Sequence, residues 1–414
     1  MQSQVKNDVC ALIGDLFFGN ESDKCSMPAE KIITNPLANW QGICDELEAQ
    51  SIPLLFSDYL IDKNLPDSVY EKWKSSCFDD FDFNIRVLDA LQWLDELLTD
   101  NKIPYMVIKG TCAAMLYPRP ILRAQGDIDI LISPHYLADA IRVLNDADCT
   151  GGNKLEGTGR SSLSRHYAYT KNKVLIEVHT RFATLNSQEK EKILDRWLYK
   201  ASEQCTIRKK VFYASFPAPP KELNGLVLLT HINQHLEEGL GLRQIIDWMM
   251  YVYNFLDDEA WPSFQKKASR LGLEKLAVTV TRMCQIYLGL PDTIQWCQGA
   301  DPELSKDLLD YIFECGNFGY KKGMSNSAAM VISHGRGLQG FFRNLQKRGE
   351  ANWELYKEHT WLKPFAWIYQ GYRYAHIALK RKHALSSLLQ DIDAGVKRGE
   401  LIDRLNATSL ARKK

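Results

Sequence analysis

The chain has 414 residues, which is enough for two or three domains with sizeable cores. Its 51 basic and 51 acidic residues balance, so no bulk charge favours long nucleic acid or an anionic membrane. No run of about 18 apolar residues predicts a transmembrane helix, and the first residues lack the plan of a signal peptide. The ten cysteines have no zinc spacing, so we expect reduced thiols in a cytoplasmic protein.

The first hundred residues have the apolar spacing of helices. Apolar residues recur every three or four positions in 9–17 and 78–97. Pro36, Pro53 and Pro66 mark breaks. No motif in residues 1–100 indicates chemistry, so we expect an N-terminal helical region that packs on the rest of the chain.

A strand, a glycine turn and a helix start are predicted at residues 103–117. The apolar run Tyr105–Ile108 ends in Lys109-Gly110-Thr111, and the next residues favour a helix. Free backbone N–H groups and the helix dipole point at such a turn, which makes it suitable for phosphate.

The next stretch, Gly126-Asp127-Ile128-Asp129-Ile130-Leu131-Ile132, alternates acidic and aliphatic residues at period two. This alternation predicts a strand with both carboxylates on one face. A divalent cation would relieve their repulsion, whereas the alternative is an edge strand whose acids face water. Ser133-Pro134 predicts the cap and first residue of the next helix.

The glycine-rich residues 150–160 favour a hairpin connection over a phosphate cradle. Two strands are then predicted at 165–170 and 174–179, joined by a tight turn at 171–173. On the second strand Glu177 and His179 share a face.

After the linker signal at 217–220 the chain is predicted to be helical to its end. We therefore expect an α/β core in residues 101–216 and a helical domain in 217–414, whose tryptophans and tyrosines belong to its core. Gly239 and Gly241 separate two helices. Gly335, Gly337 and Gly340 give only a weak phosphate signal, because no strand precedes them.

Several polar residues have two interpretations. His231 and His235 share a helix face, but no glutamate or third ligand supports zinc. Arg243 and Asp247 also share a face and are expected to form an ion pair. These two helices either close a ligand cleft or use their polar residues for packing.

Three further residues on or near the predicted strands also have two possible roles. Arg123 either contacts a phosphate or pairs with the acidic residues of the neighbouring strand. His166 and His179 either orient or contact a substrate, or serve the structure only.

The motifs in residues 108–180 resemble those of the nucleotidyltransferase superfamily that includes DNA polymerase beta. More narrowly, the chain is similar to a bacterial family of uncharacterised nucleotidyltransferases. The motifs that carry this resemblance are Lys109-Gly110, Arg123, Asp127-Ile128-Asp129-Ile130-Leu131 and Glu177-Val178-His179. The resemblance implies an α+β fold in which a small mixed sheet forms the nucleotidyltransferase core between N-terminal and C-terminal helical regions.

The resemblance also implies a chemistry. Asp127, Asp129 and Glu177 would be catalytic and would bind two Mg²⁺ ions, while Lys109, Gly110, Thr111 and Arg123 would bind the nucleotide. His166, His179, His231, His235, Arg243 and Asp247 are possible substrate contacts. The usual turn is Gly-Gly or Gly-Ser, so Lys109 and Thr111 depart from the superfamily pattern.

The resemblance therefore predicts an enzyme, a Mg²⁺-dependent nucleotidyltransferase. It would move a nucleotidyl group from a nucleoside triphosphate to a hydroxyl of a small molecule, a sugar or a protein. The alternative is a non-catalytic nucleotide-binding or partner-binding module that retains the fold. We expect no long nucleic acid and no membrane as partner. The sequence does not specify the nucleotide, the acceptor or the oligomeric state.

Overall fold

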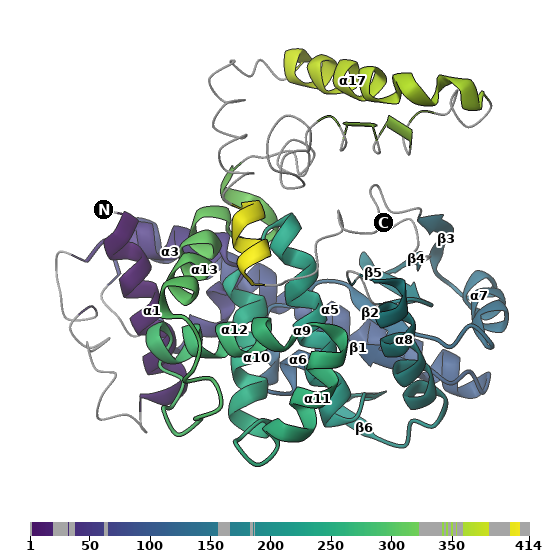
Figure 1. Ribbon diagram of the computed structural model, residues 1–414. Coiled ribbons are helices and arrows are strands. Elements are labelled where there is room, and N and C mark those ends of the chain that lie inside the picture. Colours follow the sequence, from purple (N-terminus) through teal and green to yellow (C-terminus); the bar gives the residue numbers. More distant parts are fainter. Residues whose placement is uncertain are drawn as a thin grey trace.

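A computed structural model describes residues 2–19, 38–61, 65–155, 166–182, 187–322, 359–380 and 398–405. It also describes the isolated positions 32, 185, 342, 345, 346, 349, 350 and 353. Figure 1 shows the strands gathered on one side of the molecule, with helices around them and along the opposite side.

The α-helices of the described part are α1 (Gln2–Phe18), α3 (Trp40–Ala49), α4 (Ser57–Leu60), α5 (Asp67–Asp100), α6 (Gly110–Ala114), α7 (Leu137–Asp146), α8 (Gln188–Glu203), α9 (Lys221–Glu238), α10 (Leu242–Phe255), α11 (Trp261–Leu271), α12 (Glu274–Tyr287), α13 (Pro302–Cys315) and α17 (Ala366–Lys380). The 3-10 helices are η1 (Pro53–Phe56), η2 (Pro120–Leu122), η4 (Asn317–Lys322) and η5 (Thr360–Phe365). No helix among these described segments has both the length and the apolar character to cross a bilayer.

The main sheet is mixed. Its strands are β1 (Met106–Ile108), β2 (Ile128–Leu131), β3 (Thr150–Leu155), β4 (His166–Lys171) and β5 (Val174–His179), in the spatial order β1-β2-β5-β4-β3. Only β2 and β5 pair in parallel, and the other neighbours are antiparallel. The α+β class and the helical flanks predicted from the sequence are thus confirmed.

The turn between β4 and β5 is as tight as predicted. Asn172 and Lys173 connect the strands with φ values of 51° and 66°. Two such residues with positive φ match the right-handed twist of a hairpin.

Two local predictions differ from the structure. The predicted helix after Ser133-Pro134 begins at Leu137, because Ser133 accepts a hydrogen bond from Tyr136 N and forms a turn instead of a cap. Residues 150–155 form β3 rather than a loop, since pairing with β4 outweighs the low strand propensity of their glycines. The remaining loop residues, 156–165, lie outside the described residues, as do Gly335, Gly337 and Gly340.

The residues before α9 are not a loose linker. β6 (Arg208–Val211) and β7 (Ala214–Pro217) form a separate hairpin that the sequence did not indicate. Phe216 is fully buried and Ala218 is 3% exposed, so this stretch packs into the core just before α9 begins.

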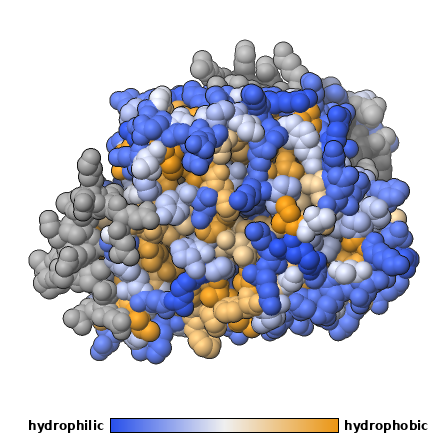
Figure 2. Space-filling model, turned by 90° about the horizontal axis from the view of Figure 1, so that it is seen from below, coloured by the Kyte–Doolittle hydropathy of each residue, from blue (hydrophilic) through white to orange (hydrophobic). Residues whose placement is uncertain are grey.

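The aromatic residues of the helical half have two environments. Trp248 and Tyr251 of α10 are core residues, as predicted. In contrast, Trp361 and Tyr372, in η5 and α17, are each 70% exposed, so the prediction that the aromatics are core is wrong there. Figure 2 shows the lower face of the molecule, where hydrophobic residues gather toward the middle of a largely hydrophilic surface.

A buried amide joins segments that are distant in sequence. Gln50, at the end of α3, is fully buried; its Oε1 accepts a hydrogen bond from Leu242 N, and its Nε2 donates to Ile312 O. These bonds fix the start of α10 and the end of α13 against the N-terminal helices.

Candidate active site

Two neighbouring strands bring the acidic residues together. In the parallel register of β2 and β5, Asp129 lies opposite Glu177, and Leu131 lies opposite His179. Side chains alternate between the faces of a sheet, so Asp129, Glu177 and His179 project from the same face. This confirms that Glu177 lies next to the acidic strand.

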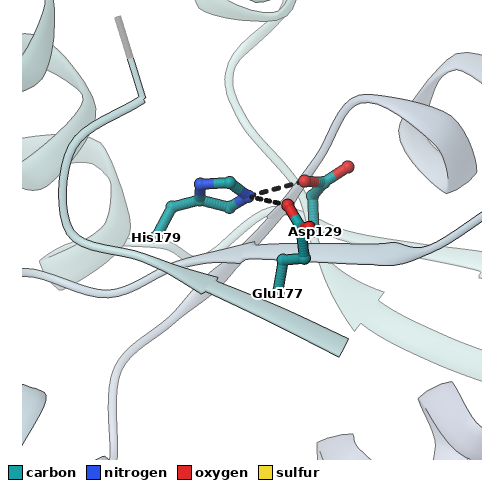
Figure 3. Close-up of side chains that lie close together, drawn as sticks. All are labelled: Asp129, Glu177 and His179. Atoms are coloured by element: carbon teal, nitrogen blue, oxygen red, sulfur yellow. Dashed lines mark hydrogen bonds and ion pairs between the residues drawn. The ribbon is translucent and has the colours of Figure 1, made fainter. Parts of the chain in front are cut away.

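The ring of His179 points toward both carboxylates, as Figure 3 shows. Its Nε2 atom is 2.6 Å from Asp129 Oδ1 and 3.3 Å from Glu177 Oε2. One ligand atom from each of the three residues lies within 4.8 Å of the others. Carboxylate oxygen and imidazole nitrogen are both metal ligands, so this cluster suits a divalent cation.

Cationic neighbours favour the ionised carboxylates. Burial would raise the pKa of Asp129, but Lys109 and His179 outweigh it and lower that pKa to about 2. Burial also opposes ionisation of Glu177, and the hydrogen bond with His179 still leaves its pKa below the ordinary value. The pKa of His179 is raised, because hydrogen bonds to both carboxylates exceed the opposing effects of burial and of Lys109.

Lys109 departs from the usual turn and reaches the acidic cluster. It follows β1 with φ 58° and ψ −126°, a conformation that is strained for a residue with a Cβ atom. Its Nζ atom lies 2.7 Å from Asp129 Oδ1, and its side chain is 12% exposed. The ammonium group therefore contacts a carboxylate oxygen of the acidic cluster.

Asp127 directly precedes β2 and lines the same pocket. Repulsion from Asp129 and burial raise its pKa to about 6. It is not one of the three residues whose ligand atoms lie within 4.8 Å of one another. The structure therefore places His179, rather than Asp127, in direct contact with Asp129 and Glu177.

A pocket of about 670 Å³, measured with its open mouth, covers the cluster. Its described lining contains nine of the residues singled out from the sequence: Lys109, Gly110, Arg123, Asp127, Asp129, Glu177, His231, His235 and Arg243. Thr111, His179 and Asp247 are not part of this lining, and all three are buried. The sheet and the pair α9 and α10 thus face each other across one cavity.

Arg123 is bound to a residue that the sequence did not suggest. Its Nε and Nη2 atoms donate to the two oxygens of Asp247 at 2.9 and 2.6 Å, and Tyr117 Oη donates to Oδ1 of the same carboxylate. The Arg123 and Asp247 side chains are only 5% and 2% exposed. The expected Arg243–Asp247 ion pair is therefore not formed, because Asp247 pairs with Arg123 across the domain.

Asn84 of α5 holds the connection that carries Arg123. It is fully buried, and its Nδ2 donates to the carbonyls of Ile121 and Arg123, while its Oδ1 accepts from Gln125 N. These three bonds satisfy backbone groups of an irregular segment. The N-terminal helix α5 thus positions a residue of the pocket.

The two histidines of α9 contact each other. Their Nε2 atoms are 2.7 Å apart, so one donates a proton to the other. Burial, and then nearby cations, lower the pKa of His235 to about 3, and the pKa of His231 is also far below its ordinary value. The pair is therefore uncharged at neutral pH. No group of metal-ligating residues in the described part of the chain includes them.

A helix begins at the turn after β1, as predicted, but this helix is short. α6 begins at Gly110 and ends at Ala114. A Cβ atom added at Gly110 would lie 3.4 Å from Gln125 Oε1 and 3.6 Å from Arg123 Nη1, which is ordinary contact. A larger side chain at this position would extend between these pocket groups.

His166 begins β4, where its backbone pairs with His179. The structure describes the backbone of His166 but not its side chain.

Sequence reasoning did not single out Gly126, Gln234, Gln244 and Phe318, which complete the pocket lining. Gln234 had a signal, since it lies between the two histidines of α9. Phe318 had none: it comes from η4, far along the chain, and its ring packs 4.8 Å from that of His235.

Comparison with known proteins agrees with this geometry. No curated protein matches the sequence significantly. A family described as uncharacterised nucleotidyltransferase matches residues 36–289, which is more than half of the chain and includes every strand. The chain therefore belongs to this nucleotidyltransferase family.

Proposed function

We propose that this protein is a Mg²⁺-dependent nucleotidyltransferase that moves a nucleotidyl group from a nucleoside triphosphate to an acceptor hydroxyl. The observation that carries the proposal is the pairing of Asp129 with Glu177 in one pocket that also contains cationic side chains. Family membership supports nucleotidyl transfer in general.

The donor set fits a hard divalent cation. Asp127, Asp129 and Glu177 would hold Mg²⁺, for which we propose two ions, and His179 would keep the carboxylates of Asp129 and Glu177 in place. Bound Mg²⁺ would stabilise the charge that develops on the phosphates and on the acceptor oxygen.

The protein's own groups would position the reactants. The backbone at Gly110, and Lys109 once it leaves Asp129, would contact phosphate oxygens. The acceptor oxygen forms a bond to the α-phosphorus, the bond to pyrophosphate breaks, and the hydroxyl proton passes to a pocket carboxylate, for which we propose Glu177. Such in-line chemistry mainly needs positioning and positive charge, which this pocket offers.

One observation favours the second candidate, a non-catalytic nucleotide-binding module. Lys109 and His179 already neutralise Asp129, so a metal ion would have to displace them or share the carboxylate. A pocket in which Lys109 and His179 already compensate the charge of Asp129 could bind a ligand without a metal ion.

Calorimetric titration of the four common nucleoside triphosphates, with Mg²⁺ and with a chelator, tests the proposal. We expect binding that needs the metal and is lost in Asp129→Asn, but kept in the control Asp139→Asn on the exposed side of α7. Binding that is independent of both metal and Asp129 would contradict the proposal.

A transfer assay separates the two candidates. A nucleotide labelled at the α-phosphate is incubated with the protein and a cell extract as acceptor source. Label on an extract component supports the enzyme, whereas metal-dependent binding without any labelling supports the module.

A further inference from the structure

The pocket contains three strong cations, and two of them are already paired. Arg123 has its guanidinium on Asp247 and on the carbonyl of Ala124. Lys109 has its ammonium on Asp129. Neither charge is available to a ligand unless an existing ion pair breaks.

Arg243 is different. It is the second residue of α10, lines the pocket and is partly buried. Its Nη1 donates to Ala124 O at 3.4 Å, a long bond, while its Nε atom is buried without a hydrogen-bond partner. Within the described residues no carboxylate lies close enough to form an ion pair with it.

Asp247, Asp127 and Asp80 act on this guanidinium electrostatically, but none of them forms an ion pair with it. Asp247, one turn further along α10, already accepts from Arg123 and Tyr117. Burial, and then repulsion from Arg123, lower the pKa of Arg243 to about 10, although attraction to Asp247 and Asp127 acts the other way. Arg243 remains a cation at neutral pH, but in an unfavourable site.

An anion in the pocket would remedy both the missing ion pair and the unsatisfied Nε–H of Arg243. It would supply the missing counter-charge and an acceptor for the orphaned Nε–H. Guanidinium presents its donors in a planar fork that fits two oxygens of a phosphate group. Asp127 lines the same pocket and attracts this guanidinium only through space, because no ion pair joins it to Arg243.

We propose that Arg243 forms a phosphate-binding subsite on the helical wall of the pocket. The subsite takes a phosphate group either of the nucleotide or of a phosphorylated acceptor. It deepens the proposed function and rests on it only for the choice of phosphate as the anion. Arg123, in contrast, has its guanidinium on Asp247 and so connects the segment before β2 to α10, the helix that carries Arg243.

The test measures binding of inorganic pyrophosphate, of the best-binding nucleotide and of inorganic phosphate, each with Mg²⁺. Arg243→Met removes the charge, and Arg243→Lys keeps the charge but loses the fork. Arg142→Met, on the exposed face of α7, is the matched control for a general change of charge. We expect about tenfold weaker pyrophosphate binding in Arg243→Met, an intermediate loss in Arg243→Lys and no change in the control.

The origin of the phosphate can be determined from two arms of the test. Weaker nucleotide binding in Arg243→Met assigns the subsite to the nucleotide. Unchanged nucleotide binding, with loss of inorganic phosphate binding to the nucleotide-saturated protein, assigns it to the acceptor. Wild-type affinity of both Arg243 variants for all three probes overturns the subsite.

Stability provides a second and independent readout. Because Arg243 is an unpaired, partly buried charge, the melting temperature of Arg243→Met without ligand should equal or exceed that of the wild type. A clear decrease, with the response to pyrophosphate unchanged, would show a purely structural role and overturn the proposal. If nucleotides fail to bind at all but phosphate binding still depends on Arg243, the proposed function fails while the subsite stands.

Discussion

Arg123 and Asp247 form a two-pronged ion pair between the connection before β2 and helix α10, with both side chains almost fully buried. Removal of one partner leaves the other as an uncompensated buried charge. We expect Asp247→Asn to reduce the free energy of unfolding by about 3–5 kcal/mol. Denaturant unfolding measures the change.

Asp139→Asn is a suitable control for this prediction, because it disturbs the exposed pair with Arg142 and should change stability by less than about 1 kcal/mol. An equally small effect of Asp247→Asn would mean that the buried pair does not hold α10 in place.

Asp127→Asn should have opposite effects with and without ligand. Repulsion from Asp129 raises the pKa of Asp127, so replacing this acid at nearly constant volume should leave the metal-free protein equally or more stable. The wild type should gain roughly 2.7 kcal/mol from Mg²⁺ and nucleotide at a hundred times Kd, and the variant almost nothing. Thermal melting with and without ligand measures both. A destabilised variant that still responds to ligand would contradict the metal-binding role of Asp127.

The pH dependence of stability should report the same carboxyl group. Its pKa is about 6 when folded, above the ordinary value of 3.8, so the folded state holds the proton more tightly. Between these two values the folded state binds more protons, and stability therefore falls as the pH rises from about 4 to 6. We expect metal-free wild type to lose roughly 2–3 kcal/mol relative to Asp127→Asn over this range. Parallel stability curves for the two proteins would argue against the raised pKa.

Lys109→Met should change the response to metal. In the proposed metal site the wild-type ammonium would compete with Mg²⁺ for Asp129 Oδ1, so its removal should lower metal-free stability and increase the stabilisation by Mg²⁺ alone. Melting curves at increasing Mg²⁺ concentrations measure the difference. If Mg²⁺ stabilises the variant less than the wild type, Lys109 assists metal binding instead of opposing it.

Gly110→Val should weaken nucleotide binding and preserve the fold. The added Cβ has room, but the two methyl groups would extend among the pocket groups near Gln125 and Arg123. We expect at least about tenfold weaker binding by calorimetry with an unchanged circular dichroism spectrum. Gly299→Val serves as control, because a Cβ at Gly299 meets no atom within 4 Å. Unchanged affinity in Gly110→Val would place the phosphates elsewhere.

Local sequence patterns predicted the positions of helices and strands better than they predicted which strands and side chains pair with each other. The alternation in 127–132 and 174–179 correctly indicated strands, and the glycines at 239–241 separated α9 from α10. The parallel register of Asp129 with Glu177 could not be read from either strand alone, because it depends on pairing between segments far apart in sequence.

The same limit explains the wrong ion pair. The spacing of Arg243 and Asp247 on one helix suggested that they pair with each other. Instead Asp247 pairs with Arg123, whose backbone carbonyl is held by Asn84 of α5. Likewise β3 and the β6–β7 hairpin depend on strand pairing that outweighs local propensity. Phosphate binding by Arg123, substrate contact by Arg243 and the functional roles of the other site residues stay predictions.

Phe318 contributes to the pocket from a segment that begins after residue 289, where the match to the family ends. The carboxylates and their cationic neighbours all lie inside the matched region. The acidic cluster and this part of the pocket wall therefore come from separate segments, one inside and one outside the family match. A substitution at Phe318 would therefore reshape the pocket wall and leave both acidic strands unchanged.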